Sequence, residues 1–305
     1  MKLFLNGIIF FTLLNSQKSQ SQTVDTLVDV GNHKLHFNII KGKGIPILFE
    51  AGAGNDATVW SSILNPIAEI TGTTLITYDR AGFGKSTINT LETDESKHGI
   101  ISSVEDLEAG LKILGYDKEI MLVSHSYGGH LSTLYSVRHP NLVKSIVLID
   151  VTHNFYYMND YFEKESKKEE KHMPELKKNN LGFYYLASNF SETIKIMGKL
   201  TIPQNIPVVD FVNDIHFFKE KDKVEYWKEC HKKFVESHPN SIKITAYGCH
   251  HYIWFDNPSL IVSAISKSYA ETLEEKHKNE VYQRALNYTI ISLNEVNKKE
   301  KRKHD

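Results

Sequence analysis

The sequence predicts an α/β protein whose mostly parallel central sheet is flanked by helices. Short apolar segments of strand length alternate along the chain with segments of helical length and spacing. Parallel strands need a crossover connection between them, and the crossover helices cover both faces of the sheet. The 305 residues are 41% hydrophobic, which is enough to bury a full core.

The charge balance and the cysteine content exclude several classes of protein. Lysine and arginine number 36 against 37 aspartates and glutamates, which gives a formal net charge of −1. Binding nucleic acid requires a basic excess, so we expect no nucleic-acid partner. Cys230 and Cys249 are too few for a disulfide-rich scaffold or a four-thiolate zinc site, although they could pair outside the cytoplasm.

An apolar amino-terminal segment predicts that residues 1–21 form a signal peptide. Lys2 precedes an apolar run over residues 3–14, and Ser19 and Ser21 place small side chains just before a cleavage site. This order of features is typical of secretory signals. The run is too short to span a bilayer core of ~30 Å, so we expect a secreted or periplasmic protein with no stable membrane span after cleavage. An uncleaved anchor is the alternative.

The folded chain is expected to begin with a hairpin, and the period of the apolar residues then separates strands from helices. Residues 28–30 and 34–40 flank Gly31-Asn32, a pair that favours a tight turn. Continuous apolar runs predict buried strands, and apolar residues at every third or fourth position predict helices. The expected order is strand 45–50, helix 56–70, strand 73–78, helix 104–114, strand 119–123, helix 128–138, strand 145–149, strand 207–212, strand 242–246 and helix 259–269.

More than fifty residues without strand character separate the strand at 145–149 from the next one. Aromatic clusters flank a mixed-charge stretch in this region. We interpret residues 154–203 as a helical cap inserted into a core formed by residues 24–153 and 204–270. Such a cap would lie over the carboxyl edge of the sheet, where ligands bind in open α/β sheets. A helix pair without contact to the substrate is the alternative.

Residues 271–305 are expected to form a charged helical tail. Leu286, Ile290 and Leu293 share one helical face within it. A short apolar stripe is more typical of a docking surface than of a functional element, so we assign it no chemical role.

Two segments imitate nucleotide-binding loops. Gly84-Lys85-Ser86 lacks the glycine that a P-loop needs five positions earlier, and Asp79 at that place would repel phosphates. Residues 52–57 (GAGNDA) fit G-x-G-x-x-A between a strand and a helix, and the next strand ends in Asp79. A nicotinamide-dependent oxidoreductase is therefore a rival interpretation, against which the preceding hairpin and the later chemistry count.

Ser126 is the candidate nucleophile. The strand at 119–123 runs into Ser124-His125-Ser126-Tyr127-Gly128-Gly129, and a helix begins at once. So sharp a turn requires small flanking residues, which here are Ser124 and Gly128. It lifts the Ser126 hydroxyl above the sheet edge and leaves the Tyr127 amide free to donate to an oxyanion. An ordinary turn that contains serines is the alternative.

Together with three other segments, this turn resembles the α/β-hydrolase family over about residues 30–270. The segment Glu50–Gly54 (EAGAG) stands where the family carries its oxyanion loop. Asp79–Ser86 (DRAGFGKS) resembles the family's D-R-x-G-x-G-x-S turn, and Gly248–Ile253 (GCHHYI) resembles the loop of the catalytic histidine. Ser124 replaces the usual first glycine of the elbow. The resemblance implies a serine–histidine–acid triad, and it explains the glycine loop without a dinucleotide.

The histidine and the acid of the triad are selected by position. His250 and His251 both follow the last predicted strand, and family spacing gives the catalytic place to His251. Neighbours in an extended segment point opposite ways, so only one can face Ser126, and the same opposition disfavours a His–His metal site. We expect neither a metal nor an organic cofactor.

Two aspartates can orient the imidazole, because each follows a strand and each preserves the order serine, aspartate, histidine. The family most often uses the later strand, which favours Asp214, but the loop there lacks the usual glycine-containing spacing. Relatives with a similar histidine region place the acid after the earlier strand, so we choose Asp150 and keep Asp214 as the alternative. Asp210 lies inside a buried strand, where an unpaired carboxylate is costly.

These residues predict a serine hydrolase that acts on a small ester-like substrate, most simply a carboxylic ester. Ser126 would attack the carbonyl, His251 would transfer the proton and Asp150 would orient it. The amides of Tyr127 and Ala53 would bind the oxyanion, and water would release the acyl-enzyme. A serine at the elbow argues against the family's dehalogenases and epoxide hydrolases, for which the resemblance implies aspartate. Hydrolysis of an amide, a thioester or a carbon–carbon bond is an alternative reaction. A binding protein that keeps the fold and has lost catalysis is another alternative.

Overall fold

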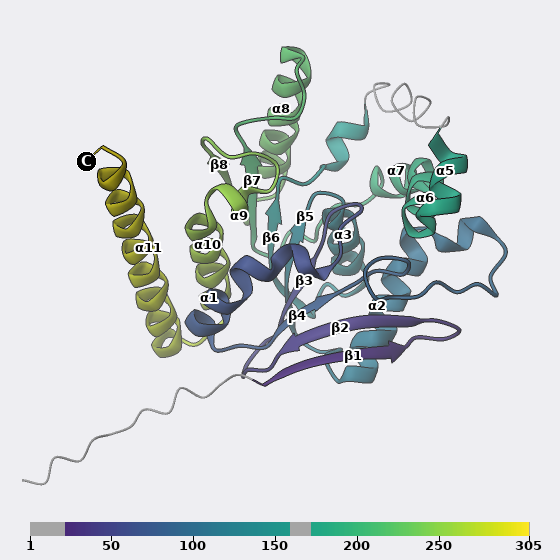
Figure 1. Cartoon of the computed structure of the whole chain (residues 1–305), viewed down its shortest axis with the longest axis horizontal. Helices are drawn as coiled ribbons and strands as arrows, with labels where there is room; N and C mark the ends of the chain where they lie inside the picture. Colours follow the sequence, from purple (N-terminus) through teal and green to yellow (C-terminus); the bar gives the residue numbers. More distant parts are fainter. Residues whose placement is uncertain (1–21, 159–171, 305) are drawn as a thin grey trace, which may run out of the picture.

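The computed structural model describes residues 22–158 and 172–304. The predicted signal peptide and the central part of the predicted cap therefore lie outside the described residues. At the centre of the molecule is an eight-stranded sheet with the order β1-β2-β4-β3-β5-β6-β7-β8 (Figure 1). Its strands are β1 Thr23–Asp29, β2 Lys34–Ile40, β3 Ile47–Glu50, β4 Leu75–Tyr78, β5 Ile120–His125, β6 Val143–Ile149, β7 Val208–Asn213 and β8 Ser241–Ala246.

The sheet is mostly parallel, as the sequence predicts. β1 pairs with β2 and β2 with β4 in antiparallel fashion, whereas every other neighbouring pair is parallel. The carboxyl ends of β3, β5, β6, β7 and β8 consequently meet at one edge. The residues that follow these strands are brought together there.

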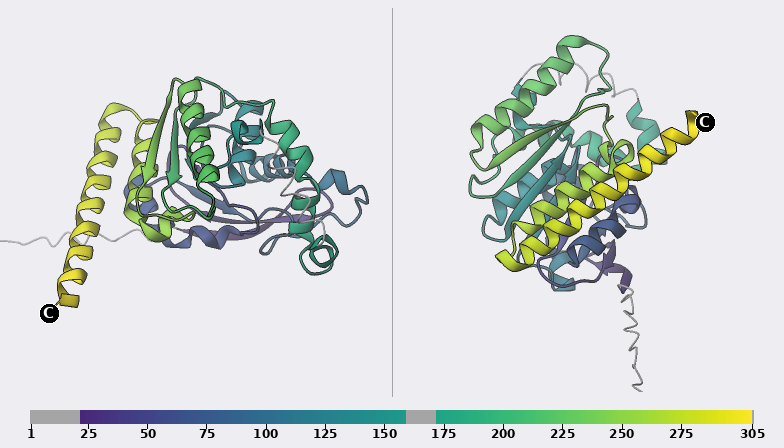
Figure 2. Two further views of the ribbon diagram at one scale, coloured as in Figure 1. Left: turned by 90° about the horizontal axis from the view of Figure 1, so that it is seen from above. Right: turned by 90° about the vertical axis from the view of Figure 1, so that its left-hand side faces the viewer.

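Helices cover both faces of the sheet (Figures 1 and 2). One face packs against α2 (Ile100–Leu114), α3 (Gly128–Arg138) and α8 (Lys221–Ser237), and the other against α1 (Ser61–Thr71) and α10 (Pro258–Ala270). Successive side chains of β5 point to opposite faces of the sheet. Ile120 and Leu122 pack on the α2, α3 and α8 side, and Met121 and Val123 pack on the α1 and α10 side. Three short helices lie in the connections, namely η1 (Ala57–Trp60), η2 (Glu95–His98) and α9 (Ile253–Asp256).

The predicted helical insertion is present between β6 and β7. It contains η3 (Asn154–Met158), α5 (Met173–Asn179), α6 (Leu181–Ser188) and α7 (Phe190–Met197). Glu95 of η2 fastens it to the core, because its carboxylate accepts hydrogen bonds from Lys177 (2.6 Å) and from the Tyr184 hydroxyl (2.6 Å).

Helix α8 is an element that the sequence analysis did not predict. Its buried side chains Trp227, Cys230, His231 and Phe234 recur every three or four positions, which is the spacing of a helix that packs on one face. The signal was weak because charged residues fill the rest of the segment. The omission matters, since α8 supplies Trp227, whose Nε1 donates to Asp150 at the site described below.

The carboxy-terminal helix α11 (Glu275–His304) lies along α10 on the outside of the sheet (Figure 2). Val281 and Ala285 make the buried contact at 2% and 0% exposure, whereas Leu286 and Ile290 stay 46% and 48% exposed. The docked face is therefore not the stripe that the sequence suggested. Among the described residues, no helix combines the length and apolar character needed to cross a bilayer.

The two cysteines are free and buried. Cys230 packs with Trp227 and Val212 against one face of the sheet, and Cys249 belongs to the cluster on the α1 and α10 side. The disulfide that an oxidising compartment would allow is thus not formed.

Asp79 ties the turn after β4 to two other segments. Its buried carboxylate accepts hydrogen bonds from the Ala57 amide (2.8 Å), the Lys85 amide (2.8 Å) and His36 Nδ1 (2.9 Å). The turn passes so close that a Cβ on Gly84 would lie 2.2 Å from Asp79 Oδ2, and Gly84 has a positive φ of 52°. A glycine is required there for both reasons.

We expect Asp79→Asn to lower the free energy of unfolding by about 2–4 kcal/mol, because a single acceptor oxygen would face three donors in a buried site. Urea unfolding measures the change. Asp29→Asn is the matched control, since its carboxylate accepts one exposed hydrogen bond from the Gly31 amide (3.0 Å) and should matter by less than ~0.5 kcal/mol. Equal losses in the two variants would contradict the role given to Asp79.

Candidate active site

Ser126 occupies a strained turn between β5 and α3. Its φ is +52°, a left-handed conformation that non-glycine residues rarely adopt and that clusters at functional sites. The turn is held because the Ser126 amide donates to the Ile149 carbonyl (3.2 Å) and the buried Ser124 hydroxyl bonds that of Ser132. A Cβ on Gly128 would lie 2.5 Å from the Glu50 carbonyl oxygen, so α3 can begin this close to β3 only with glycine at that place.

Asp150 ends the neighbouring strand β6 and contacts the imidazole of His251. His251 Nδ1 donates to Asp150 Oδ2 at 2.6 Å. The other oxygen, Oδ1, accepts from Trp227 Nε1 (3.1 Å) and from the Asn213 amide (3.2 Å). The carboxylate is fully buried and its residue has a φ of +49°, so the acid is fixed from three sides in a second strained position.

His251 follows β8 and is held by the residue that precedes the candidate nucleophile. Burial, together with the charge of His251, lowers the pKa of His125 well below its usual range, so the His125 ring is neutral. Its Nε2–H donates to the His251 backbone carbonyl (3.1 Å), and the two ring centroids are 4.4 Å apart. This contact brings the histidine loop directly against the Ser126 turn.

The Ser126 hydroxyl makes no hydrogen bond to any of the described residues, so its bond to His251 is not formed in this conformation. Catalytic hydrogen bonds commonly tighten only when the substrate is bound. The His251 side chain keeps 23% of its surface exposed.

The other candidates from the sequence lie away from this contact. Asp214 pairs loosely with Lys228 Nζ (3.5 Å) and accepts from the Gly248 amide (3.5 Å). The exposed His250 ring turns toward Asp256, with Nδ1 3.1 Å from Oδ2. Asp214 therefore braces the turn before His251 instead of contacting its imidazole.

Arg80 orients the loop after β3, although the sequence analysis gave it no role. Its Nη1 and Nη2 donate to the carbonyls of Ala51 and Gly52, both at 2.6 Å. The C=O of Gly52 and the N–H of Ala53 belong to one planar trans peptide and point in opposite directions. Because Arg80 holds the carbonyl on the buried side, the Ala53 amide is directed outward. The amides of Ala53 and Tyr127 donate to no described residue.

Ser126, Tyr127 and Ala53 line one cavity of about 450 Å³ together with helices of the insertion. Its remaining walls are His130, Thr152, Met173, Leu176, Phe183, Leu186, Ala187, Ser188, Phe190 and Ser191. No aspartate, glutamate, lysine or arginine is among these described lining residues. Burial lowers the pKa of His130 to about 3, so this wall is also uncharged at neutral pH.

The glycine loop of the rival dinucleotide interpretation has a different use here. A Cβ on Gly52 would lie 2.8 Å from His125 Nδ1, so this glycine permits close packing against the Ser126 turn. The Asp79 carboxylate, which a ribose would need, accepts three internal hydrogen bonds instead.

The sequence did not predict that Trp227 and Asn213 donate to Asp150. Helix α8, which carries Trp227, was not predicted, and Asn213 donates through its backbone N–H, which has no sequence signature.

Comparisons with known proteins agree with the fold. The family model described as alpha/beta hydrolase fold matches residues 45–189. The uncharacterized protein YqjL of Bacillus subtilis (strain 168) is 26% identical over 223 residues, or 73% of this chain and 82% of that protein. The (lyso)-N-acylphosphatidylethanolamine lipase of Bos taurus is 33% identical over 107 residues, which cover 34% of this chain and only 30% of the lipase.

Solved structures are similar over most of the chain. A mutant epoxide hydrolase of Vigna radiata superposes with a TM-score of 0.66 at 16% identity, covering 82% of this chain and 99% of that one. At this level of identity the likeness shows the shared fold alone.

Glu50, at the end of β3, should make stability depend on pH. Burial raises its pKa from the usual 4.5 to about 7, against the opposing effects of Arg80 and of the Tyr78 hydrogen bond. The folded state therefore holds a proton that the unfolded state releases, and the stability gained at low pH is lost as the pH rises through about 7.

We expect the free energy of unfolding of the wild type, relative to Glu50→Gln, to fall by about 2–3 kcal/mol between pH 5 and pH 8. Urea unfolding of both proteins at several pH values measures this difference. Glu119→Gln serves as control, because that side chain is 56% exposed and should leave the pH slope unchanged. A wild-type slope equal to that of Glu50→Gln would show that Glu50 is ionised in the folded protein.

Proposed function

Because the chain belongs to the α/β-hydrolase fold family, we propose that it is a serine hydrolase that cleaves carboxylic esters through an acyl-enzyme. The observation that carries the proposal is the 2.6 Å contact between His251 and Asp150, formed beside a serine whose φ is +52°. These are the parts that a hydroxyl nucleophile needs, namely an exposed oxygen, a base and a group that orients the base.

In the proposed first step, Ser126 Oγ attacks the ester carbonyl while His251 Nε2 accepts the hydroxyl proton. Asp150 holds the proton on Nδ1, which leaves Nε2 as the basic nitrogen, and it stabilises the imidazolium that forms. His251 then gives its proton to the leaving alcohol as the tetrahedral intermediate collapses. The same groups activate water to hydrolyse the acyl-enzyme.

The negative oxygen of each tetrahedral intermediate would be bound by the amides of Tyr127 and Ala53. The Tyr127 amide is at the amino terminus of α3, where the helix dipole favours negative charge. The Ala53 amide is directed by the two hydrogen bonds of Arg80. Donors fixed in advance are worth roughly 10²–10³ each in turnover.

The cavity supports an uncharged, apolar acyl group. Its described walls carry no ionised side chain, and Leu186, Phe183 and Phe190 supply apolar surface beside Ser126. A charged acyl group would lose hydration there without gaining a partner. Epoxide hydrolysis by this family requires an elbow carboxylate, which Ser126 does not provide.

We expect a fluorophosphonate probe to label Ser126 alone, because the probe reacts with a serine activated by an adjacent base. Ser126→Ala should abolish labelling and lower kcat on a chromogenic ester by about 10⁴-fold or more. Labelling is read by mass spectrometry of the intact protein and of its peptides.

Ser191→Ala is the matched control, since Ser191 lines the same cavity away from the strained turn, and it should label normally. Folded wild type that resists the probe and has no esterase activity would favour a binding protein on this fold. Labelling that persists in Ser126→Ala would place the nucleophile elsewhere.

Asp150→Asn should lower kcat by about 10⁴-fold, because the amide cannot stabilise the imidazolium. Asparagine tolerates a positive φ, so the turn can be kept, and circular dichroism checks the fold. Asp214→Asn should change kcat less than about threefold, since that carboxylate makes only two weak contacts at 3.5 Å. Collapse of turnover in Asp214→Asn alone would reverse the assignment of the acid.

A further inference from the structure

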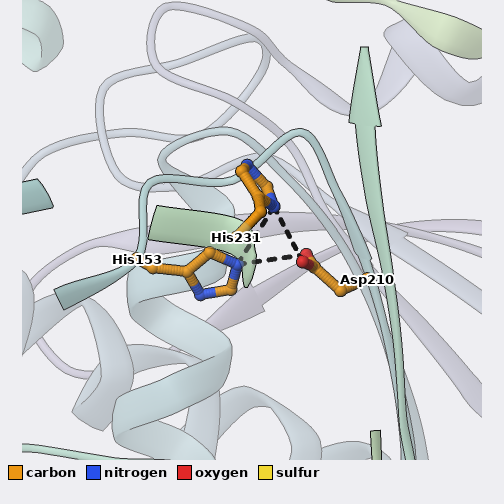
Figure 3. Close-up of side chains that lie close together, drawn as sticks. All are labelled: His153, Asp210 and His231. Carbon is orange, nitrogen blue, oxygen red and sulfur yellow. Dashed lines mark hydrogen bonds and ion pairs between the residues drawn. The ribbon is translucent and has the colours of Figure 1, made fainter. Parts of the chain in front are cut away.

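A second histidine–aspartate cluster lies outside the cavity of Ser126, and Figure 3 shows its three side chains. It joins His153, which follows β6, Asp210 of β7 and His231 of α8. His153 Nε2 is 3.1 Å from Asp210 Oδ1, and His231 Nδ1 is 2.7 Å from Asp210 Oδ2. The two nitrogens are 3.2 Å from each other. The two imidazole nitrogens and the carboxylate oxygens thus point toward one another, as the close-up shows.

The cluster is buried, with 6%, 0% and 1% exposure for His153, Asp210 and His231. None of the three lines the cavity of Ser126, so the proposed ester chemistry does not use them. Asp210 lies inside a strand, where an unpaired carboxylate is costly. The structure shows that the carboxylate is paired, by two imidazoles that come from distant segments.

The Asp210 carboxylate lies between two side chains of a type that binds metals. Its partners are the two imidazoles, and no described lysine or arginine contacts it. Asp150 is a second fully buried carboxylate near the cluster, linked to α8 through Trp227. One divalent ion between His153, His231 and Asp210 would stabilise the buried carboxylate and use all three side chains as ligands.

We propose that His153 Nε2, His231 Nδ1 and an oxygen of Asp210 bind one zinc ion. Two imidazole nitrogens and one carboxylate are a common protein ligand set for zinc, and imidazole disfavours magnesium and calcium. Donor atoms about 3 Å apart can each reach an ion at the usual distance of about 2.0–2.2 Å after a small adjustment. His153 also lines a cavity of about 300 Å³, from which an ion would enter.

The ion would have a structural role. It would join the loop after β6, strand β7 and helix α8, three segments distant in sequence. His231 is one helical turn beyond Trp227 and shares its face of α8. Trp227 Nε1 donates to Asp150 (3.1 Å), so zinc at His231 would hold in place the helix that positions the acid.

Zinc binding is measured on the full-length, untagged protein after treatment with a chelator. Calorimetric titration with zinc chloride and elemental analysis should give one ion per chain. Saturating zinc should raise Tm by about 5 °C over the chelated protein. Cobalt(II) should give visible absorption bands of a bound ion, a readout that does not depend on esterase activity.

His153→Gln and His231→Gln should each weaken zinc binding by at least about tenfold. His33→Gln is the matched control, because His33 bonds a single aspartate, Asp106, at 2.9 Å, and should retain one ion per chain. If His231→Gln does not fold, His153→Gln and the cobalt spectrum of the wild type still test whether the cluster binds a metal ion. Folded wild type that binds no more zinc than His153→Gln would overturn the proposal and leave a metal-free pair of imidazoles donating to Asp210.

Discussion

The hydrogen bond between His251 and Asp150 is the interaction on which the rest of the site depends. It joins the loop after β8 to the end of β6 across the intervening strand β7, so it fixes one part of the sheet edge relative to another. A fully buried carboxylate is costly unless each oxygen is satisfied. Asp150 meets this requirement with donors from β7, α8 and the histidine loop. The need to satisfy one charge therefore positions three separate segments.

Three other buried carboxyl groups show that the cost of burying this group can be offset in different ways. Asp79 is surrounded by two backbone amides and a histidine, and it organises the turn after β4. Burial raises the pKa of Glu50 to about 7, and its Oε1 accepts from the Tyr78 hydroxyl. Asp210 is held between two imidazoles. Backbone hydrogen-bond donors, a retained proton and neighbouring imidazoles thus each offset the desolvation cost of a buried carboxyl group.

Much of this arrangement could be predicted from particular residues. The strained turn at Ser126 follows from a strand that runs into small residues and a helix, and the parallel sheet follows from the apolar periods. The choice between Asp150 and Asp214 could not be derived in the same way, because both end neighbouring strands and only the path of the loop decides which carboxylate contacts His251. Arg80 was visible within a motif, but its action on the Gly52 carbonyl depends on tertiary placement. Helix α8 was missed because its buried face, marked by Trp227 and His231, lies among many charged residues.

The residues proposed for catalysis and those that would select the substrate come from different parts of the fold. Ser126 and Asp150 both have a positive φ, at +52° and +49°, and each such residue costs on the order of 1–3 kcal/mol. Neither conformation would persist unless the core specified it, and the contacts that do so come from β5 to β8, α3 and α8. The apolar walls beside Ser126 come instead from α5, α6 and α7 of the insertion. Side chains such as Phe183 and Leu186 can therefore vary, and with them the acyl group that fits, without disturbing the groups that would carry out the chemistry.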